Sequence, residues 1–281
     1  MGKSTVLITG CSSGIGLAAA VMLAQDPEHK YKVYATMRNI ASKDNLEKAA
    51  GSALNETLFI RTLDVTKDDT VTTLVEDIIR EDGKIDVLVN NAGIGGSDGI
   101  LYKSMEWSHG VMDTNFWGVV RLTRAVLPSM KERSAGRIIN ISSMAGINGL
   151  PFFSIYSASK FAMEGYTESI APILLAYNIR VSLIEPAGVL TEIITKYKSI
   201  PFEKHVEGYD DVMRGMYIEM MTPKPGSITA SLQTADDIAK IVKEVAESES
   251  PHLRYQSTEA VEQLAGRKWV DPTGDSLLKP K

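Results

Sequence analysis

The first segment of the chain places a glycine-rich turn between an apolar run and a helical stretch. Residues 4–9 are β-branched and apolar, which is typical of a buried parallel strand. The run continues into Gly10-x-x-x-Gly14-x-Gly16 and then into a helical stretch from Leu17 to Gln25. Glycines allow a tight turn, and a helix N-terminus offers unpaired N–H groups to an anion. We therefore predict a pyrophosphate site here. The spacing differs from Gly-x-Gly-x-x-Gly, and a flexible turn without a ligand is the alternative.

A second apolar run, residues 32–36, ends at Met37-Arg38. In a sheet of this kind the tip of the second strand meets the adenosine ribose, where an acid accepts hydrogen bonds from a free 2′-hydroxyl. No acid stands at that point in the sequence, and Arg38 can pair with a 2′-phosphate instead. This favours NADP(H) over NAD(H), and a solvated arginine is the alternative interpretation.

Three more apolar runs each end in a polar cluster. Residues 57–63 lead to Asp64-Val65, residues 85–89 to Asn90-Asn91-Ala92-Gly93, and residues 137–141 to Ser142-Ser143. Ligands of open α/β sheets bind outside the carboxyl ends of the strands, so these clusters predict one shared crevice. Ordinary turn chemistry is an equally good explanation of the Asn-Asn-Ala-Gly segment taken alone.

Strand-like runs alternate with longer helical stretches along the whole chain. The helical stretches begin near Leu17, Thr70, Met105, Ser157 and Ala235. Residues 179–184 and 253–256 complete the strands. This order predicts an α/β fold of the Rossmann type: a doubly wound parallel sheet of about seven strands with helices on both faces, in a single domain over residues 1–281.

Composition excludes several classes of protein. A net charge of −5 argues against binding to nucleic acid. Cys11 is the single cysteine, and the four histidines (His29, His109, His205, His252) lack ligand-like spacing, so we expect no disulfide within the chain and no bound metal. No secretory signal or apolar run near ~18 residues is present. We expect a cytoplasmic protein with at most peripheral membrane contact.

Tyr156 and Lys160 are the residues most suggestive of chemistry. A phenol with a pKa of about 10 needs a neighbouring positive charge to act as an acid or base near neutral pH. Residues four apart lie on one face of a helix, so Lys160 is placed to supply that charge. An isolated Tyr-x-x-x-Lys match is weak, because most such pairs are surface neighbours.

The complete set of motifs resembles the short-chain dehydrogenase/reductase family. It comprises Thr9-Gly10-x-x-x-Gly14-x-Gly16, Asn90-Asn91-Ala92-Gly93, Asn115, Ser143 and Tyr156-x-x-x-Lys160, in family order and over essentially the whole chain. Within the family, residues 7–17, 33–38 and 158–165 resemble the branch that acts on retinoids and 17β-hydroxysteroids. The resemblance implies an NADP(H)-dependent homodimer that interconverts a hydrophobic aldehyde or ketone with its alcohol. Retinal and retinol are the first expectation, a 17β-hydroxysteroid is the alternative, and a non-catalytic NADP(H)-binding protein is a remote one.

The resemblance also assigns roles to residues. Tyr156 would transfer the proton and Ser143 would bind the substrate oxygen, so both would contact substrate, whereas Ser142 would be structural. Lys160 would hold the nicotinamide ribose and lower the pKa of the tyrosine, and Asn115 would anchor a water. Besides Tyr156 and Lys160, the cofactor residues would be Thr9, Gly10, Ser12, Ser13, Gly14, Ile15, Gly16, Arg38, Asp64, Val65, Asn91, Ala92, Gly93, Val189 and Thr191.

Two segments depart from the family pattern or from any regular one. Ala187 stands where the family usually has glycine, which forbids a positive φ unless the loop shifts toward Gly188. Residues 192–233 lack a regular pattern and are predicted to form a substrate lid. A possible lipid-binding or core-packing stripe within it comprises Met213, Met216, Tyr217 and Met220. Residues 271–281 are predicted to be a loose polar tail.

Overall fold

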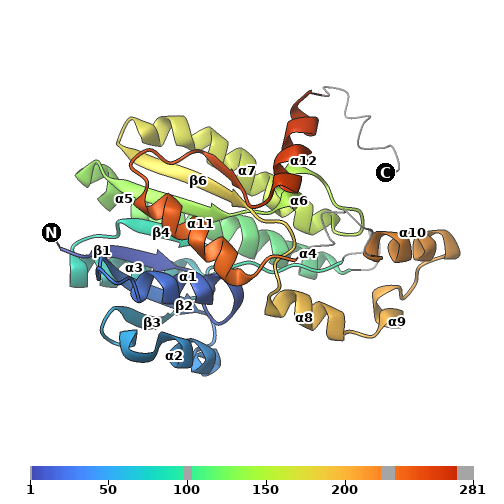
Figure 1. Cartoon of the computed structure of the whole chain (residues 1–281), viewed down its shortest axis with the longest axis horizontal. Helices are drawn as coiled ribbons and strands as arrows, with labels where there is room; N and C mark the ends of the chain where they lie inside the picture. The colour runs from blue at the N-terminus through green and yellow to red at the C-terminus, as the bar shows by residue number, and fades with distance from the viewer. Residues whose placement is uncertain (1, 98–102, 223–231, 271–281) are drawn as a thin grey trace.

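The computed structural model describes residues 2–97, 103–222 and 232–270. Its strands form one parallel sheet in the order β3-β2-β1-β4-β5-β6-β7 (Figure 1). The strands are β1 (Ser4–Ile8), β2 (Tyr31–Met37), β3 (Leu58–Thr62), β4 (Val87–Asn90), β5 (Gly136–Ile141), β6 (Ile179–Glu185) and β7 (Arg254–Gln256). The predicted doubly wound sheet is confirmed, including its short final strand.

Helices connect the strands and cover the sheet. They are α1 (Gly14–Ala24), α2 (Asp44–Ala50), α3 (Asp68–Asp82), α4 (Met105–Met112), α5 (Gly118–Arg133), α6 (Met144–Ile147), α7 (Ser154–Leu175), α8 (Glu192–Ser199), α9 (Phe202–His205), α10 (Asp211–Met221), α11 (Ala235–Glu247) and α12 (Glu259–Val270). Short 3-10 turns lie at η1 (Ile40–Ser42) and η2 (Gly51–Ala53), and a π-helical turn, η3 (Asp113–Trp117), joins α4 to α5. Helix α1 begins at Gly14 rather than at Leu17, so the last glycines of the turn form its first turn.

Hydrophobic side chains on opposite faces of the sheet build two cores. On β1, Val6 and Ile8 belong to the core under α1, α2 and α11, whereas Leu7 belongs to the core under α3, α5 and α7. This alternation follows from the two-residue period of a strand. Because both faces are covered, the central strands are mostly apolar, as in residues 6–8 of β1 and 87–89 of β4.

The strand order places the predicted crevice at the carboxyl edge of the sheet. Strand β1 lies between β2 and β4, so the chain turns to opposite sides after β1 and after β4. Ligands of open α/β sheets bind at such a switch point. The segments after β1, β4 and β5 carry the glycine turn, Asn91 and Ser143, and all three open onto this edge.

The predicted lid contains more regular structure than its sequence indicated. Residues 192–233 were expected to be irregular, but helices α8, α9 and α10 form within them. These helices lie at one end of the molecule, beyond the carboxyl edge of the sheet (Figure 1). Residues 223–231 of the lid and the tail at 271–281 lie outside the described residues. Within the described residues, no helix has both the length and the apolarity to cross a membrane.

Candidate active site

Hydrogen bonds fix the glycine turn to the segment that follows β4. The Thr9 hydroxyl accepts from the backbone N–H groups of Asn91 (3.0 Å) and Ala92 (2.9 Å). In return, the Asn91 side-chain amide donates to the carbonyls of Thr9 (2.8 Å) and Gly10 (3.1 Å). Both donors of this amide are therefore used within the protein. Thr9 and Asn91 shape the turn, which leaves ligand contacts to other atoms.

The turn itself has the backbone geometry that its glycines allow. Gly10 and Gly14 have φ angles of +73° and +60°, a region that other residues rarely adopt. A side chain on Gly16 would clash with the Asn91 amide and the Gly10 carbonyl. Ser12 lies in the turn, Ser13 is the N-cap of α1, and Ile15 packs against the core below.

The N-terminus of α1 is open to an anion. The Ser13 side chain makes no capping hydrogen bond, and the first turn carries no acidic residue. The first N–H groups of a helix have no partner within the helix, and its dipole favours a negative charge there. The turn and helix therefore fit a pyrophosphate. Cys11, within the turn, is buried, and burial raises the pKa of its thiol to about 12, so it remains an unreactive thiol.

Arg38 and Asp64 lie at the ends of the neighbouring strands β2 and β3. Arg38 is exposed, and its charge acts on the Asp64 carboxyl. Burial alone would raise the pKa of Asp64, but the Thr66 amide and hydroxyl donate to the carboxylate and, with Arg38 and Lys67, bring the pKa below its ordinary value. The arrangement combines a fixed carboxylate with an exposed cation at the end of the crevice where the sequence predicts the adenosine.

Other predicted cofactor residues pack against this framework. Val65 is buried, and a side chain on Gly118 would lie 2.9 Å from its Cγ2 atom. Thr191 lies directly over the glycine turn, because its Cγ2 atom would be 3.1 Å from a Cβ on Gly14. Val189 is buried in the core that includes α1 and α11 and bridges to Gln233.

The loop after β6 follows its expected path without a strained backbone. Neither Ala187 nor Gly188 has a positive φ, so alanine is tolerated. The Ala187 N–H donates to the Ser257 hydroxyl at 3.0 Å, and the Gly188 carbonyl accepts from the Gln233 N–H at 2.9 Å. These two hydrogen bonds to the C-terminal segments fix the loop, so a glycine with a positive φ is not needed there.

Ser143 and Tyr156 come together from different elements. Ser143 caps α6 by accepting from the Ala145 N–H at 3.1 Å, and Tyr156 lies in the first turn of α7. Burial raises the pKa of the Tyr156 phenol, and a hydrogen bond with the Ser143 side chain partly offsets this. The ring packs on Gly95, where a Cβ would lie 2.8 Å from the Tyr156 Cδ2 atom.

Lys160 brings a buried ammonium group to the same place. Its Nζ donates to the Ile141 carbonyl at 2.8 Å and lies 5.8 Å from the centre of the Tyr156 ring. Burial lowers the pKa of Lys160 to about 8, although the Glu164 carboxylate acts to raise it. A Cβ on Gly93 would lie 3.9 Å from the Nζ, so Gly93 borders the same space.

Three hydrogen bonds fix the Asn115 side chain within the protein. It lies in the π-helical turn η3 and is completely buried. Its oxygen accepts from the Ile94 N–H at 2.8 Å, and its amide donates to the Ile94 carbonyl at 2.8 Å and to the Ser159 hydroxyl at 3.0 Å. Both amide donors are used, so a further water can bind Asn115 only by donating, either to the second lone pair of Oδ1 or to the backbone carbonyl.

A comparison with protein families bears on this geometry. The family model for short chain dehydrogenases matches residues 4–200, which contain the glycine turn, Asn91, Ser143, Tyr156 and Lys160. This match covers more than half of the chain. The chain belongs to the short-chain dehydrogenase family.

Curated members of the family resemble this chain over nearly its whole length. Retinol dehydrogenase 8 from Bos taurus is 43% identical over 276 residues, which cover 98% of this chain and 88% of that protein. The human 17-beta-hydroxysteroid dehydrogenase type 1 is 34% identical over 278 residues, covering 99% of this chain and 84% of that protein. A solved structure, ElxO with NADP bound, has a TM-score of 0.73 and 27% identity and covers 91% of this chain and 98% of that one.

Asn140, Thr167 and Gly95 shape the site of this short-chain dehydrogenase but were not predicted from its sequence. The Asn90 amide donates to the Asn140 side chain (2.8 Å), which donates to the Thr167 hydroxyl (2.9 Å), so a polar chain links β4, β5 and α7. A single polar residue within the apolar run of β5 was the available signal for Asn140. Gly95, which packs on Tyr156, gave no signal in the sequence.

The four residues of the predicted methionine stripe do not all lie on one face of the lid. Tyr217 is 2% exposed and forms a cluster with Phe152 and Val206, against which Met213 and Met220 pack. Met216 is 56% exposed and does not belong to this face. The stripe is therefore correct for three of its four members, which contribute to an aromatic core within the lid.

Proposed function

We propose that this protein is an NADP(H)-dependent oxidoreductase that interconverts a hydrophobic aldehyde or ketone with its alcohol, with retinal and retinol as the first substrate pair. The main support is the convergence of Ser143, Tyr156 and Lys160 at the carboxyl edge of the sheet, beside the glycine turn. A proton donor and a fixed cation next to a dinucleotide turn are the groups that carbonyl reduction requires.

The glycine turn and Arg38 are the parts of the chain that would hold NADP(H). The open amides at the start of α1 suit the pyrophosphate, and the exposed Arg38 guanidinium suits the 2′-phosphate. Asp64 and Val65 would border the adenine, whereas Asn91, Ala92, Gly93, Val189 and Thr191 would border the ribose and nicotinamide. NADP bound to ElxO supports this choice of cofactor. When bound, the nicotinamide exchanges a hydride with the substrate carbon.

Tyr156 would donate its proton to the substrate oxygen during reduction and accept it during oxidation. Ser143 would hydrogen-bond the same oxygen and stabilise its developing charge. The Lys160 ammonium would stabilise the phenolate and so lower the pKa of Tyr156, opposing the effect of burial. A water that donates to an oxygen of Asn115 would link Lys160 to solvent, since both side-chain donors of Asn115 are already used.

The substrate assignment rests on the relatives and on the lid. Retinol dehydrogenase 8 is more similar to this chain than 17-beta-hydroxysteroid dehydrogenase type 1 is, which favours a retinoid over a steroid. The aromatic cluster of Phe152, Tyr209 and Tyr217 makes the lid apolar on the side that packs on Phe152, which agrees with a hydrophobic substrate. A 17β-hydroxysteroid is the second candidate, because it has the same apolar character.

The exposed apolar residues of α7 and η3 support a homodimer. Ile173 is 62% exposed and Trp117 is 50% exposed, and they lie within residues 154–177 and 104–133, the helical stretches through which the family resemblance implies dimerisation. We also propose a cytoplasmic protein with at most peripheral membrane contact.

The deciding experiment measures NADPH oxidation by the purified protein with all-trans-retinal and with estrone in parallel, using Tyr156→Phe as the blank. We expect turnover of retinal well above that of estrone. The reverse result would assign the steroid function instead. Binding of NADPH without turnover of either compound would contradict both and support a non-catalytic NADP(H)-binding protein.

A further inference from the structure

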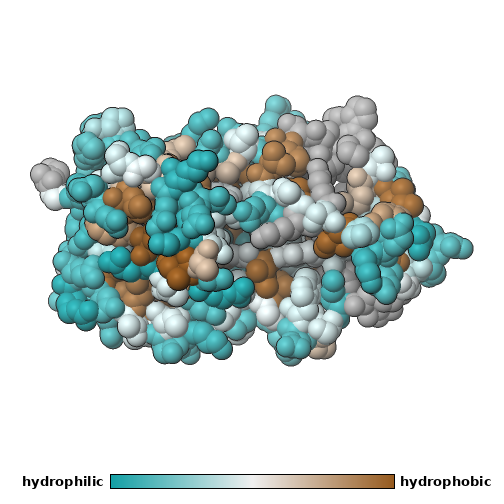
Figure 2. Space-filling view, turned by 90° about the horizontal axis from the view of Figure 1, so that it is seen from below, coloured by the Kyte–Doolittle hydropathy of each residue, from teal (hydrophilic) through white to brown (hydrophobic). Residues whose placement is uncertain are grey.

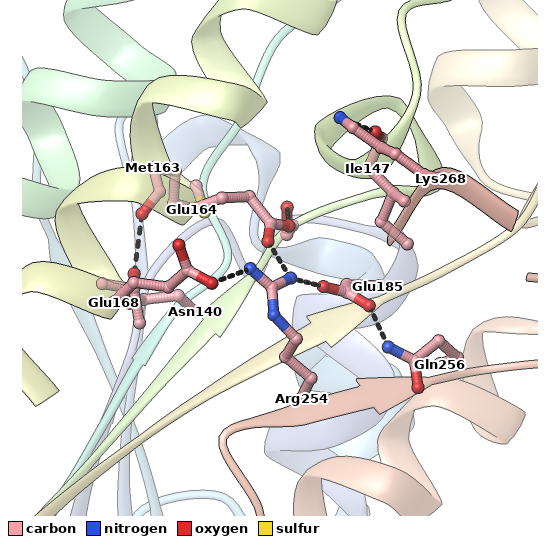
Figure 3. A network of polar contacts seen from close by, with 11 residues as sticks. Asn140, Ile147, Met163, Glu164, Glu168, Glu185, Arg254, Gln256 and Lys268 are labelled. Atoms are coloured by element: carbon pink, nitrogen blue, oxygen red, sulfur yellow. Dashed lines mark hydrogen bonds and ion pairs between the residues drawn. The ribbon is translucent and has the colours of Figure 1, made fainter. Parts of the chain in front are cut away.

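One arginine behind the catalytic residues joins three carboxylates from two elements. Arg254 lies on β7, and its Nη1 atom contacts both Glu164 of α7 and Glu185 of β6 (Figure 3). Its Nη2 atom donates to Glu168 at 2.8 Å. Gln256 also donates to Glu185. Burying two carboxylates against one guanidinium nitrogen costs desolvation free energy. This cost is offset only when every group of the network is hydrogen-bonded.

The Glu164 carboxylate connects this network to the serine loop. Its second oxygen accepts from the Ser142 hydroxyl, and Ser142 directly precedes Ser143. The same oxygen lies against Gly146, where a Cβ would be 2.7 Å away. Glu164 is 4% exposed, so water screens these contacts little. The carboxylate therefore touches both ends of the short loop and helix that carry Ser143.

Glu164 also lies one helical turn after Lys160 on α7. It is the charged group whose field acts on the buried Lys160 ammonium, and it favours the protonated form. Lys268 of α12 faces the same network and donates to the Ile147 carbonyl. Burial and the nearby Glu164 raise the pKa of Glu185, so Glu185 binds a proton more readily than an ordinary glutamate.

We propose that Glu164 is a positioning residue of the proton-transfer site: Arg254 and the Ser142 hydroxyl clamp its carboxylate, which fixes the Ser143 loop and keeps the positive charge on Lys160. Arg254 supplies the counter-charge that allows a carboxylate in this interior. The inference rests on the proposed function, because it assumes that Lys160 acts beside Tyr156 in proton transfer. It does not depend on the identity of the substrate.

Glu168 provides a matched control on the same helix. It also pairs with Arg254, but its side chain is 45% exposed, and its ion pair lies on Nη2 of Arg254, not on the Nη1 that contacts Glu164. Glu164→Gln removes the charge and keeps the shape, and Glu168→Gln makes the same change one turn further along α7. A general weakening of the Arg254 network affects both variants, whereas loss of support for Lys160 affects the first alone.

The experiment follows the titration of Lys160 by NMR in the full-length protein labelled with ¹³C-lysine, without cofactor, with the signal assigned by its loss in Lys160→Met. We expect the midpoint of Lys160 to fall by about one pH unit in Glu164→Gln and to stay unchanged in Glu168→Gln. With NADPH and substrate, the alkaline limb of the reduction rate should move to lower pH by a similar amount in Glu164→Gln alone.

An unchanged Lys160 midpoint in Glu164→Gln would overturn the inference, whatever the turnover. If that variant does not fold, Arg254→Lys replaces it: a single ammonium cannot match the guanidinium fork, so the midpoint should fall by a smaller amount. No movement in Arg254→Lys would then count against the proposal. A shifted midpoint in a protein that turns over neither retinal nor estrone would refute the proposed function and leave this inference standing.

Discussion

The cofactor end and the lid are built in different ways. Around the glycine turn, the Thr9 hydroxyl and Asn91 amide bond to backbone atoms, and the strands beneath are fully buried. On the lid, Val212 is 72% exposed and Met216 is 56% exposed. Figure 2 shows hydrophobic side chains on the surface at the end of the molecule that carries α10.

This difference indicates which end of the molecule tolerates change. At the cofactor end the contacts use backbone atoms and glycine conformations, so few substitutions preserve them. On the lid, side chains pack on one another and on Phe152, so they can be exchanged without disturbing the sheet.

The largest expected effect concerns Tyr156, the proposed proton donor. Tyr156→Phe removes only the hydroxyl, and loss of a general acid lowers rates by about 10²–10⁴-fold. We expect turnover of retinal to fall by at least about 10³-fold, while the dissociation constant for NADPH changes by less than about threefold. Steady-state kinetics and fluorescence titration measure the two quantities. Retained turnover would show that another group supplies the proton.

Two glycine substitutions compare the regions directly. Gly16→Ala forces a Cβ into the Asn91 amide and the Gly10 carbonyl, so we expect it to lower the free energy of unfolding by about 3 kcal/mol and to abolish NADPH binding. Gly215→Ala, in lid helix α10, meets nothing within 4 Å and should stabilise the protein by about 0.5–1 kcal/mol. Urea unfolding measures both. Equal changes in the free energy of unfolding would contradict the expectation that the cofactor end tolerates substitution less than the lid does.

A charge change tests the adenosine end of the cofactor site. Arg38→Asp replaces a cation with an anion at the tip of β2, which repels a 2′-phosphate and accepts hydrogen bonds from a free ribose. The ratio of kcat/KM for NADPH to that for NADH should fall by about 10–100-fold, the size expected for a charge-assisted hydrogen bond. Arg61→Asp, on β3, serves as a control for the change of charge alone. An unchanged ratio in Arg38→Asp would exclude a phosphate contact.

The rate of reduction should depend on pH through Lys160. Its pKa of about 8 places the loss of its positive charge just above neutral pH. As the pH rises through this value, Lys160 loses its proton and no longer stabilises the phenolate, so kcat/KM for reduction should fall about tenfold per pH unit. A profile measured from pH 6 to 10 tests this. A rate that stays flat to pH 9.5 would show that Lys160 keeps its charge in the complex.

The sequence predicted the cofactor end much better than the lid. Apolar runs ending in Asp64, Asn91 and Ser143 predict both the sheet and its ligand edge, because parallel strands bring their carboxyl ends together. The Tyr156 and Lys160 pair was predicted from helical spacing together with the other motifs, because the spacing alone is a weak signal. These features depend on local sequence, and the strand boundaries differ from the predicted ones by only one or two residues.

The contacts that the sequence could not predict are those between distant segments. Arg254 meets Glu164 and Glu185 only because β7 joins the edge of the sheet and α7 packs over it. No local pattern distinguishes these charges from solvated ones. In the same way, a helical period marked the lid stripe, but only the packing against Phe152 shows that Met216 points away from it. The tertiary structure decides such cases.

The smallest expected effect comes from substitutions on the two faces of the lid helix α10. Met213 packs against the cluster of Phe152 and Tyr217, whereas Met216 is exposed on the same helix. Met216→Ala should therefore change stability by no more than about 0.5 kcal/mol and leave the KM for retinal unchanged, while Met213→Ala should cost about 1–2 kcal/mol and raise that KM. Thermal unfolding and steady-state kinetics measure both. If Met216→Ala raises the KM more than Met213→Ala does, the substrate contacts the outer face of α10, and the aromatic cluster serves only to hold the lid together.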